Sequence, residues 1–327
     1  MKKVFAVLAA CVMVGSLFTG CGAGSGDKKA SAGKPEPKKQ FINIATGGTA
    51  GTYFPLGGAL ANILNKAIPG ANAAAQSSGG SVANVNLLKE GKVDIGFVQN
   101  DITYYAAHGT EMFKGKQVGN LKALTCLYPE TVQLVTTKDT GIKSIADLKG
   151  KRVSVGPAGS GSEANARQVL EEAGLTYDDI KPQYLSLADA SNAMKDGNVD
   201  ANFCTGASPT AAIQDLAAVR DVVVIPIDGD LAAKLMKKYP FYAKDVVPAN
   251  TYKGVGQDVQ TIAVKCMLVT TDKMSDDLGY NVVKALYGNL DAMKAAHNVG
   301  KFITKKTAKE GLSIDLNKGA EKFFNEK

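Results

Sequence analysis

The sequence contains no tryptophan, only two histidines and only three arginines among its 327 residues. The histidines, His108 and His297, are too few and too isolated to form a metal cluster or the relay of a serine hydrolase. The three arginines are far apart, so the chain lacks the basic stripe that nucleic-acid binding requires. These absences make an enzyme the least favoured function and exclude a nucleic-acid partner.

Cysteine is also scarce, with five residues in all. Cys126, Cys204 and Cys266 lie outside the N-terminal segment, at wide spacing and without a C-x-x-C or zinc pattern. They are most simply buried apolar thiols. The glycine loop at residues 156–161 lacks the lysine of a phosphate-binding P-loop. We therefore expect no metal and no cofactor.

The first twenty residues have the pattern of a bacterial lipoprotein signal peptide. Lys2 and Lys3 precede an apolar run from Val4 to Phe18, which is short for a membrane span. The stretch Leu-Phe-Thr-Gly-Cys21 resembles the lipoprotein box. We expect residues 1–20 to be removed and the sulfur of Cys21 to be lipidated; a soluble secreted protein or an uncleaved anchor is the alternative.

Residues 21–40 are expected to form a flexible, lipid-anchored tether. They are rich in Gly, Ser, Pro and Lys and contain no large apolar residue. Five lysines against Asp27 and Glu36 give residues 22–40 a charge of +3, and residues 41–327 carry only +2 of the chain's +7. The basic balance suits a tether beside an anionic membrane surface. We expect an extracytoplasmic protein, in the periplasm or on the outer face of the cytoplasmic membrane.

One unit, a strand followed by a glycine loop and a helix, occurs twice. The second copy has a short strand ending at Val155, a loop at 156–161 and a helix at 163–173, with Ser160 and Glu163 in capping-box spacing. The first copy has a strand at 41–44, a loop at 46–52 and a helix at 53–66. A glycine loop that opens a helix leaves backbone N–H groups free beside the positive end of the helix dipole. Both copies therefore predict a seat for an anion.

A second repeat lies downstream of each copy. In both places a helix ends in an acidic residue plus glycine, and a short strand follows. The matching residues are Gly91 and Gly197, Val93 and Val199, Asp94 and Asp200, and Phe97 and Phe203. Two halves built alike predict an α/β fold with two lobes facing each other across a ligand cleft.

Two apolar runs, 121–136 and 261–270, are expected to be hinge strands between the lobes. The predicted first lobe comprises residues 41–131 and 262–327, and the second comprises residues 132–261. The C-terminal segments with a helical period, which should pack on the first lobe, are 275–298 and 303–324.

Open α/β sheets bind ligands at the carboxyl ends of their strands, and five polar loops of this chain follow such ends. Converging helix N-termini suit a carboxylate, and lobe closure would exclude water and strengthen each hydrogen bond. Glu163 and Asp101 would suit an ammonium group, which favours an amino acid. The predicted ligand-binding residues are Gly48, Thr49, Gly51, Thr52, Tyr53, Ser78, Gly79, Gly80, Ser81, Asn100, Asp101, Ser160, Gly161, Ser162, Glu163, Thr205, Gly206 and Ser208.

Three of the candidate side chains have a second interpretation. Glu163 can instead complete the capping box and point away from the cleft. Tyr53 either lies against the ligand's carbon skeleton or belongs to the core. Arg167, one turn into its helix, either reaches a carboxylate or lies on a solvated helix face.

Five motifs in order resemble the TAXI family of solute-binding proteins, the extracytoplasmic receptors of a subgroup of TRAP transporters. The motifs are Thr46-Gly-Gly-Thr-Ala-Gly-Thr-Tyr53, Ser78-Gly-Gly-Ser81, Leu127-Tyr-Pro-Glu-Thr131, Val155-Gly-Pro-Ala-Gly-Ser-Gly-Ser-Glu163 and Gly197-Asn-Val-Asp-Ala201. The resemblance covers residues 41 to about 325. It implies a type II periplasmic-binding-protein fold that delivers a glutamate-like ligand to an integral-membrane permease driven by an ion gradient. Ser162 stands where threonine is common in the family, and Cys204 where the family varies.

The sequence thus favours a monomeric receptor for a small carboxylate or amino acid, anchored to the membrane and serving a TRAP permease. The alternative is an ABC-type or sensory receptor of the same fold, which would have the same cleft. An extracytoplasmic enzyme is the least favoured reading, because it needs a nucleophile, an acid–base pair or a metal.

Overall fold

The computed structural model describes residues 39–326. The predicted signal peptide, the lipidation site Cys21 and the tether up to residue 38 lie outside the described residues. The described residues belong to one compact unit, Pro37–Lys327. Within residues 39–326, no helix combines the length and the hydrophobicity that crossing a membrane requires.

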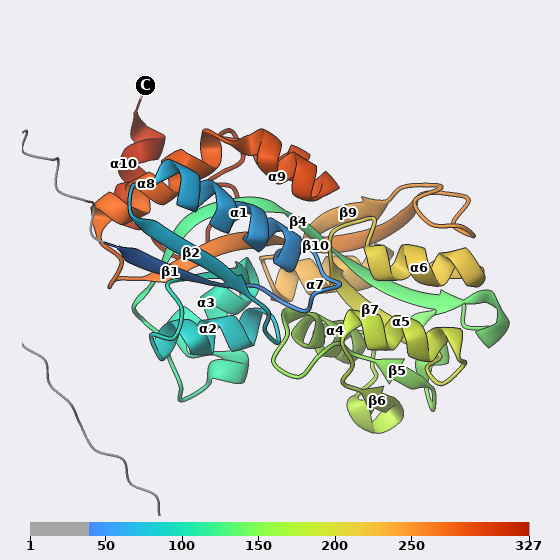
Figure 1. Cartoon of the computed structure of the whole chain (residues 1–327). Helices are drawn as coiled ribbons and strands as arrows, with labels where there is room; N and C mark the ends of the chain where they lie inside the picture. Colours follow the sequence, from blue (N-terminus) through green and yellow to red (C-terminus); the bar gives the residue numbers. More distant parts are fainter. Residues whose placement is uncertain (1–38, 327) are drawn as a thin grey trace, which may run out of the picture. The chain divides into compact units, whose positions relative to one another are not determined.

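A ten-stranded mixed sheet forms the framework of this unit (Figure 1). Its strand order is β2-β1-β3-β10-β4-β7-β5-β6, with β8 beside β4 and β9 beside β10. The strands are β1 (Gln40–Ala45), β2 (Ala71–Gln76), β3 (Ile95–Gln99), β4 (Leu121–Thr137), β5 (Arg152–Ser154), β6 (Lys181–Gln183), β7 (Ala201–Gly206), β8 (Val222–Ile225), β9 (Ala243–Val247) and β10 (Val259–Thr271). The trios β2-β1-β3 and β6-β5-β7 are both parallel and have the same order, as expected of two halves built alike.

The two predicted hinge segments are long strands that run from one half of the sheet to the other. The first part of β4 pairs with β10, and its remainder pairs with β7 and β8. The change of partner falls at Thr131, which pairs with Ala263 of β10 and with Gly206 of β7. Likewise β10 pairs with β9 at its start and with β3 further on. The resulting architecture is the two-lobed type II periplasmic-binding-protein fold, whereas the exact lobe boundaries stay a prediction.

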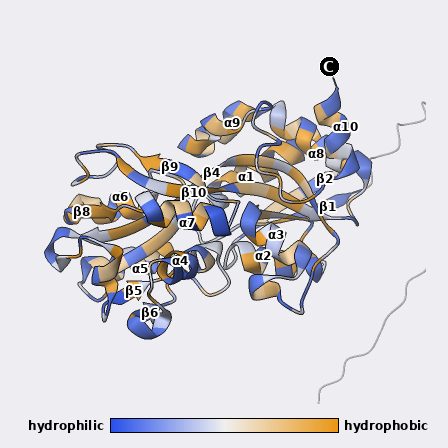
Figure 2. Ribbon diagram, turned by 180° about the vertical axis from the view of Figure 1, so that it is seen from behind, coloured by the Kyte–Doolittle hydropathy of each residue, from blue (hydrophilic) through white to orange (hydrophobic). Residues whose placement is uncertain are grey.

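Helices cover both faces of the sheet in each half. They are α1 (Tyr53–Ala67), α2 (Ser81–Lys89), α3 (Asn100–His108), α4 (Gly161–Glu172), α5 (Leu187–Lys195), α6 (Ala211–Val219), α7 (Gly229–Lys238), α8 (Asp276–Tyr287), α9 (Leu290–Ala296) and α10 (Lys318–Asn325). Figure 2 shows the central strands as mainly hydrophobic, with hydrophilic residues along the surrounding helices and loops.

Three clusters of buried side chains hold these layers together. One cluster packs the apolar face of α1 and α8 against residues such as Ile42 and Ile44 of β1. A second joins α2 and α3 to α4 and α7, and therefore extends through both halves. A third packs α5 and α6 against residues such as Cys204 of β7. Burial of apolar surface at about 25 cal/mol per Å² is the main stabilising contribution of such clusters.

Each half fastens its first strand with an aspartate at the same place. Asp94 Oδ2 accepts the amide of Asn43 at 2.7 Å, and Asp200 Oδ2 accepts the amide of Arg152 at 2.8 Å. These aspartates are the pair that the sequence repeat aligned. The repeated Gly-x-Val-Asp motif therefore marks the end of a helix and supplies the aspartate that binds the first strand of its half.

The C-terminal prediction is wrong for part of its length. Residues 275–298 contain α8 and α9, but of 303–324 only the end is helical, in α10. The preceding stretch lies along β4, where Ala308 O accepts the Cys126 amide and Asp315 O accepts the Ala123 amide. Gly311, with φ of +86°, also interrupts any helix there. Turns at 305–311 and the backbone bonds from β4 to Ala308 and Asp315 take the place of a helix here.

Candidate functional site

The first turns of five helices surround one pocket, which has a volume of about 400 Å³. Residues at the starts of α1, α2, α4, α5 and α6 line it, together with the ends of β3 and β7. The glycine loops place these helix starts at the carboxyl ends of the strands, as the sequence predicts. A pocket of this size suits a small molecule.

The structure brings fourteen of the predicted binding residues together in this pocket. They are Gly48, Thr49, Gly51, Thr52, Tyr53, Ser78, Gly79, Gly80, Ser81, Ser160, Gly161, Ser162, Thr205 and Gly206. Their role in binding stays a prediction. The predicted residues outside the pocket lining are Asn100, Asp101, Glu163 and Ser208.

Asp101 does not face the pocket, because it lies in the first turn of α3, which begins at Asn100. Asp101 is 1 % exposed and accepts hydrogen bonds from Asn165 Nδ2 at 2.9 Å and the Ile102 amide at 2.8 Å. Burial raises its pKa to about 6. Asn100 donates its amide group to Gly311 O. Both side chains are therefore hydrogen-bonded within the protein and are not positioned to bind an ammonium group of a ligand.

Glu163 also points away from the pocket, because α4 begins at Gly161 rather than at Glu163. Its Oε1 accepts the Tyr177 hydroxyl at 2.8 Å and lies 3.8 Å from Arg167 Nε. The predicted capping box is therefore half formed: Ser160 Oγ accepts the Glu163 amide at 3.1 Å, but the carboxylate serves Tyr177. Arg167 lies among Glu111, Glu163 and Glu171, so neither of its predicted alternatives describes it fully.

Several pocket residues lie outside the predicted set. They are Gly47, Ala50, Ser77, Gln99, Glu130, Pro157, Ser186, Leu187, Ala188, Cys204 and Thr210. Ser186 caps α5 by accepting the Asp189 amide, so the S-x-x-D spacing could have revealed this helix start. Glu130 reaches the pocket from the middle of β4, and no local pattern indicates that.

The two halves touch each other around the pocket. The Ala83 amide on α2 donates to Gly159 O at 3.0 Å, and the Ala207 amide donates to Thr52 Oγ1 at 3.3 Å. Gly80 has φ of +107°, and a Cβ there would lie 3.3 Å from the Ser160 Cβ. Only glycine permits this backbone conformation and close approach together. The structure therefore shows the lobes in contact across the site.

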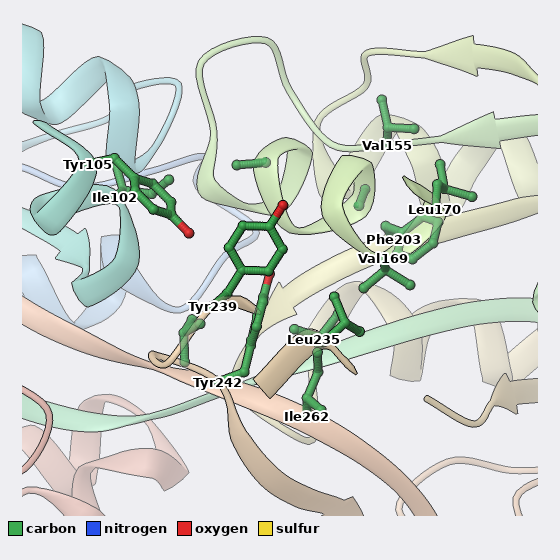
Figure 3. Packing of buried hydrophobic residues seen from close by; sticks show 14 of the residues in the cluster. Ile102, Tyr105, Val155, Val169, Leu170, Phe203, Leu235, Tyr239, Tyr242 and Ile262 are labelled. Carbon is green, nitrogen blue, oxygen red and sulfur yellow. The ribbon is translucent and has the colours of Figure 1, made fainter. Parts of the chain in front are cut away.

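A buried network of amides and tyrosines reinforces this contact. Gln99 Nε2 donates to Asn165 Oδ1 at 2.9 Å, which links the end of β3 to α4. Asn165 Nδ2 donates to the Tyr242 hydroxyl at 2.8 Å, and the same hydroxyl donates to Gln168 Oε1 at 2.6 Å. Figure 3 shows Tyr242 between Tyr105 of α3 and the apolar residues of α4. Each buried polar group has a partner here, which favours one defined arrangement of the lobes.

The described residues that line the pocket include no lysine, arginine or histidine, and Glu130 is their one charged side chain. Glu130 is 2 % exposed, and its Oε2 accepts the Tyr53 hydroxyl at 2.9 Å. Burial raises its pKa to about 8, so Glu130 is mainly a neutral acid at pH 7. Tyr53 also lies 5.4 Å from the Phe97 ring centroid, which places it in the core and the pocket wall at once.

The neutral donors of this pocket suit an anion. Three of the helix starts, those of α1, α2 and α6, carry no side-chain cap hydrogen bond. Their first amides lie at positive dipole ends and have no side-chain acceptor, although the Ala83 amide of α2 already donates to Gly159 O. Cys204 stays a thiol, because burial raises its pKa to about 12. Within the part of the chain that the structure describes, no three His, Cys, Asp or Glu side chains gather to hold a metal.

The sequence matches the NMT1-like family over residues 44–327. It is 41% identical over 73 residues to an Escherichia coli K12 protein named for binding aliphatic sulfonates, a match that spans 22% of this chain and 23% of that protein. The alkanesulfonate-binding protein SsuA of Xanthomonas axonopodis pv. citri, solved with MOPS, has a TM-score of 0.48 at 18% identity, covering 80% of this chain and 74% of its own. A Bordetella bronchiseptica RB50 structure has a TM-score of 0.50 at 16% identity, covering 87% and 82%.

These findings correct the predicted resemblance. The assignment to the TAXI family and to a TRAP transporter is wrong, since the matching family is NMT1-like and the Escherichia coli relative is named for binding aliphatic sulfonates. The glycine loops that suggested this assignment can hold an anion at helix starts in many proteins. They therefore indicate the fold and not the type of transporter. The name of the Escherichia coli relative agrees with a solute-binding protein, the coarser part of the prediction. The chain belongs to the NMT1-like family.

Proposed function

We propose that the protein is an extracytoplasmic solute receptor that captures a small organic anion, a sulfonate or a carboxylate, and delivers it to an ABC-type membrane transporter. The observation that carries this proposal is the convergence of five helix starts on a pocket whose lining has no basic side chain. Backbone N–H groups in fixed positions can hold an anionic head without a charged partner.

The geometry favours an anion over a cation. A sulfonate or carboxylate presents two or three acceptor oxygens, which the backbone amides of Thr52, Ser81 and Ser162 and the hydroxyl of Thr52 can serve together. The cavity of about 400 Å³ leaves room for a short carbon chain beside Leu187. The hydroxyl of Thr205 is buried without a partner among the described residues and lies in the pocket lining. A bound oxygen atom would satisfy it.

Two further observations support a receptor rather than an enzyme. The sequence relative is named for binding, and the pocket offers a thiol and a carboxyl group without a base positioned to activate the thiol. The predicted lipoprotein signal would hold such a receptor at the membrane, near its transporter. Binding by lobe closure would let the transporter distinguish the loaded receptor from the empty one.

A thermal-shift screen of the purified full chain tests this function. The chain would first be unfolded and refolded to release any bound ligand, and the released material would be identified by mass spectrometry. The probes are 1-propanesulfonate, isethionate, propionate, succinate and glutamate. Because the chain has no tryptophan, a dye must report unfolding.

A ligand at a hundred times its dissociation constant adds about 2.7 kcal/mol, which raises the midpoint by several degrees. We expect a shift with at least one anion, and recovery of that anion unchanged. The cation 1-propylamine, with the same carbon chain as 1-propanesulfonate, is the matched control and should give no shift. A response to the amine alone, or chemical turnover of the ligand, would refute the proposal.

A further inference from the structure

Glu130 lies at the point where β4 passes from one half of the sheet to the other. It pairs with Val264 of β10 and precedes Thr131, which contacts both β10 and β7. Its side chain is buried and lines the pocket. A carboxyl group in this position meets the ligand, or the water that replaces it, at the centre of the site.

The groups that face this carboxyl offer no positive charge. Tyr53 of α1 donates to Oε2 at 2.9 Å, and Tyr128 of the same strand donates to Oε1 at 3.4 Å. The other titratable groups near it are Asp101 of α3, Cys204 of β7 and Cys266 of β10.

The basic side chains that could neutralise Glu130 lie near other carboxylates. Lys265, beside Val264 on β10, lies 3.8 Å from Glu310, and all three arginines pair with other carboxylates. A buried carboxylate without a counter-ion is costly, and the group avoids this cost by staying protonated. The raised pKa of about 8 agrees with this geometry, since burial is its largest cause.

Glu130 is also close to the anion seat. The Tyr53 hydroxyl that donates to Glu130 lies 3.4 Å from Ser81 Oγ, at the first residue of α2. One tyrosine hydroxyl therefore connects the carboxyl group to a helix start that would hold the anionic head. An anion there would repel an ionised Glu130 across a pocket with little water to screen the two charges.

We propose that Glu130 is a specificity-determining residue that keeps its proton while the pocket holds an anion, so that the receptor binds the anion only when Glu130 is neutral. The proposal deepens the proposed function and rests on it. The neutral acid can donate its O–H to an oxygen of the ligand, whereas the carboxylate would exclude that ligand. A bound anion raises the pKa of Glu130 further, by the same coupling with which ionised Glu130 weakens anion binding.

The sign of the pH dependence follows from this coupling. Below a pH of about 8 the carboxyl group of the empty protein is already protonated, so anion affinity should not change with pH. Above that value each pH unit should weaken binding about tenfold, because binding must first return the proton. A ligand that paired an ammonium group with Glu130 would show the opposite slope.

The first measurement needs no ligand. Carbon-13 NMR of the full chain, labelled at the glutamate carboxyl carbon, follows each carboxyl from pH 4 to pH 10, and Glu130→Gln identifies the Glu130 signal by its loss. We expect that signal to titrate near pH 8. Titration below pH 6 would overturn the proposal, whether or not any anion binds.

The second measurement is calorimetry with 1-propanesulfonate between pH 6.5 and pH 9.5. We expect wild type to lose about tenfold in affinity from pH 8.5 to pH 9.5 and to take up protons on binding. Glu130→Gln, which resembles the neutral acid, should bind with little dependence on pH. Glu163→Gln is the matched control, because Glu163 lies outside the pocket, and it should keep the wild-type slope.

The outcomes separate this proposal from the function on which it rests. If neither 1-propanesulfonate nor any other anion binds at any pH, the proposed function fails while the NMR titration still decides whether Glu130 holds a proton. If the anion binds but the slope is absent, is reversed, or persists in Glu130→Gln, the receptor function stands and the role of Glu130 is refuted.

Discussion

The two strand–loop–helix units share a topology but hold their helix starts differently. In the second unit Ser160 caps α4, and the guanidinium of Arg152 pairs with Asp200. In the first unit neither α1 nor α2 has a side-chain cap, and Asp94 accepts a backbone amide without an arginine beside it. The first half therefore leaves more of its backbone donors available. If the pocket binds an anion as proposed, we predict that the first half supplies more of the backbone donors and the second half the more rigid closing surface.

The largest expected effect on anion affinity is at Gly161, where the loop before α4 contacts the first half. A Cβ at Gly161 would lie 1.1 Å from Gln99 Oε1, so Gly161→Ala must displace a buried side chain that also bonds Asn165. The displaced Gln99 would give up its link between the halves, at a cost of about 1–3 kcal/mol. We expect the anion affinity to fall at least about tenfold, measured by calorimetry with the best probe of the screen.

Gly48→Ala in the first loop is the matched control. No atom lies within 4 Å of the Cβ that it would add. Its affinity should stay close to wild type. Equal losses in the two variants would show that the loops respond to added volume alone and that closure against Gln99 has no special role.

The helix-start loops were predictable because their signals lie in neighbouring residues. Glycines followed by hydroxyl residues at helix starts predicted the loops at 46–52 and 156–161, because helix capping and tight turns depend on neighbouring residues. The sequence-based prediction missed Ser186, where the helix start has no glycine, although the S-x-x-D spacing was present. It placed Asp101 and Glu163 in the cleft because a shift of one or two residues in a helix start turns a side chain to another face.

Glu130 could not be predicted in the same way. It follows Pro129 within an apolar strand, and its place in the pocket depends on the pairing of β4 with β10, more than a hundred residues away in the chain. The long-range register of a sheet is set by tertiary packing. The same limit explains residues 303–317, whose helical period is overridden because β4 needs a backbone partner there.

The next prediction concerns the two aspartates, Asp94 and Asp200, that bind the first strand of each half. Asp200 accepts the Arg152 amide and pairs with its guanidinium, so Asp200→Asn should lower the free energy of unfolding by about 1–2 kcal/mol, after allowing for solvent at a 40% exposed arginine. Asp94→Asn replaces a charged acceptor of one exposed backbone amide by a neutral one and should cost about 0.5–1 kcal/mol. Urea unfolding at pH 7 measures both.

Low pH should reduce the difference in the free energy of unfolding between wild type and Asp200→Asn. Hydrogen bonds from Arg152 lower the pKa of Asp200 below its ordinary value, so its stabilising effect is present above the unfolded-state pKa and is lost as the pH falls through the folded-state pKa. The gap between wild type and Asp200→Asn should therefore be smaller at pH 3 than at pH 7. A gap that stays constant would mean that packing rather than charge holds this strand.

The smallest expected effect concerns the helix caps themselves. Ser160 Oγ accepts the Glu163 amide, so Ser160→Ala should lower the free energy of unfolding by about 1 kcal/mol. Thr52 precedes α1 but has helical backbone angles and no side-chain cap bond, so Thr52→Ala should cost less than about 0.5 kcal/mol. Thr52 Oγ1 does accept the Ala207 amide from the other half at 3.3 Å, so its removal should weaken anion binding more than it weakens the fold. Urea unfolding and calorimetry on the two variants separate these effects, and equal stability losses would show that the two helix starts are held alike after all.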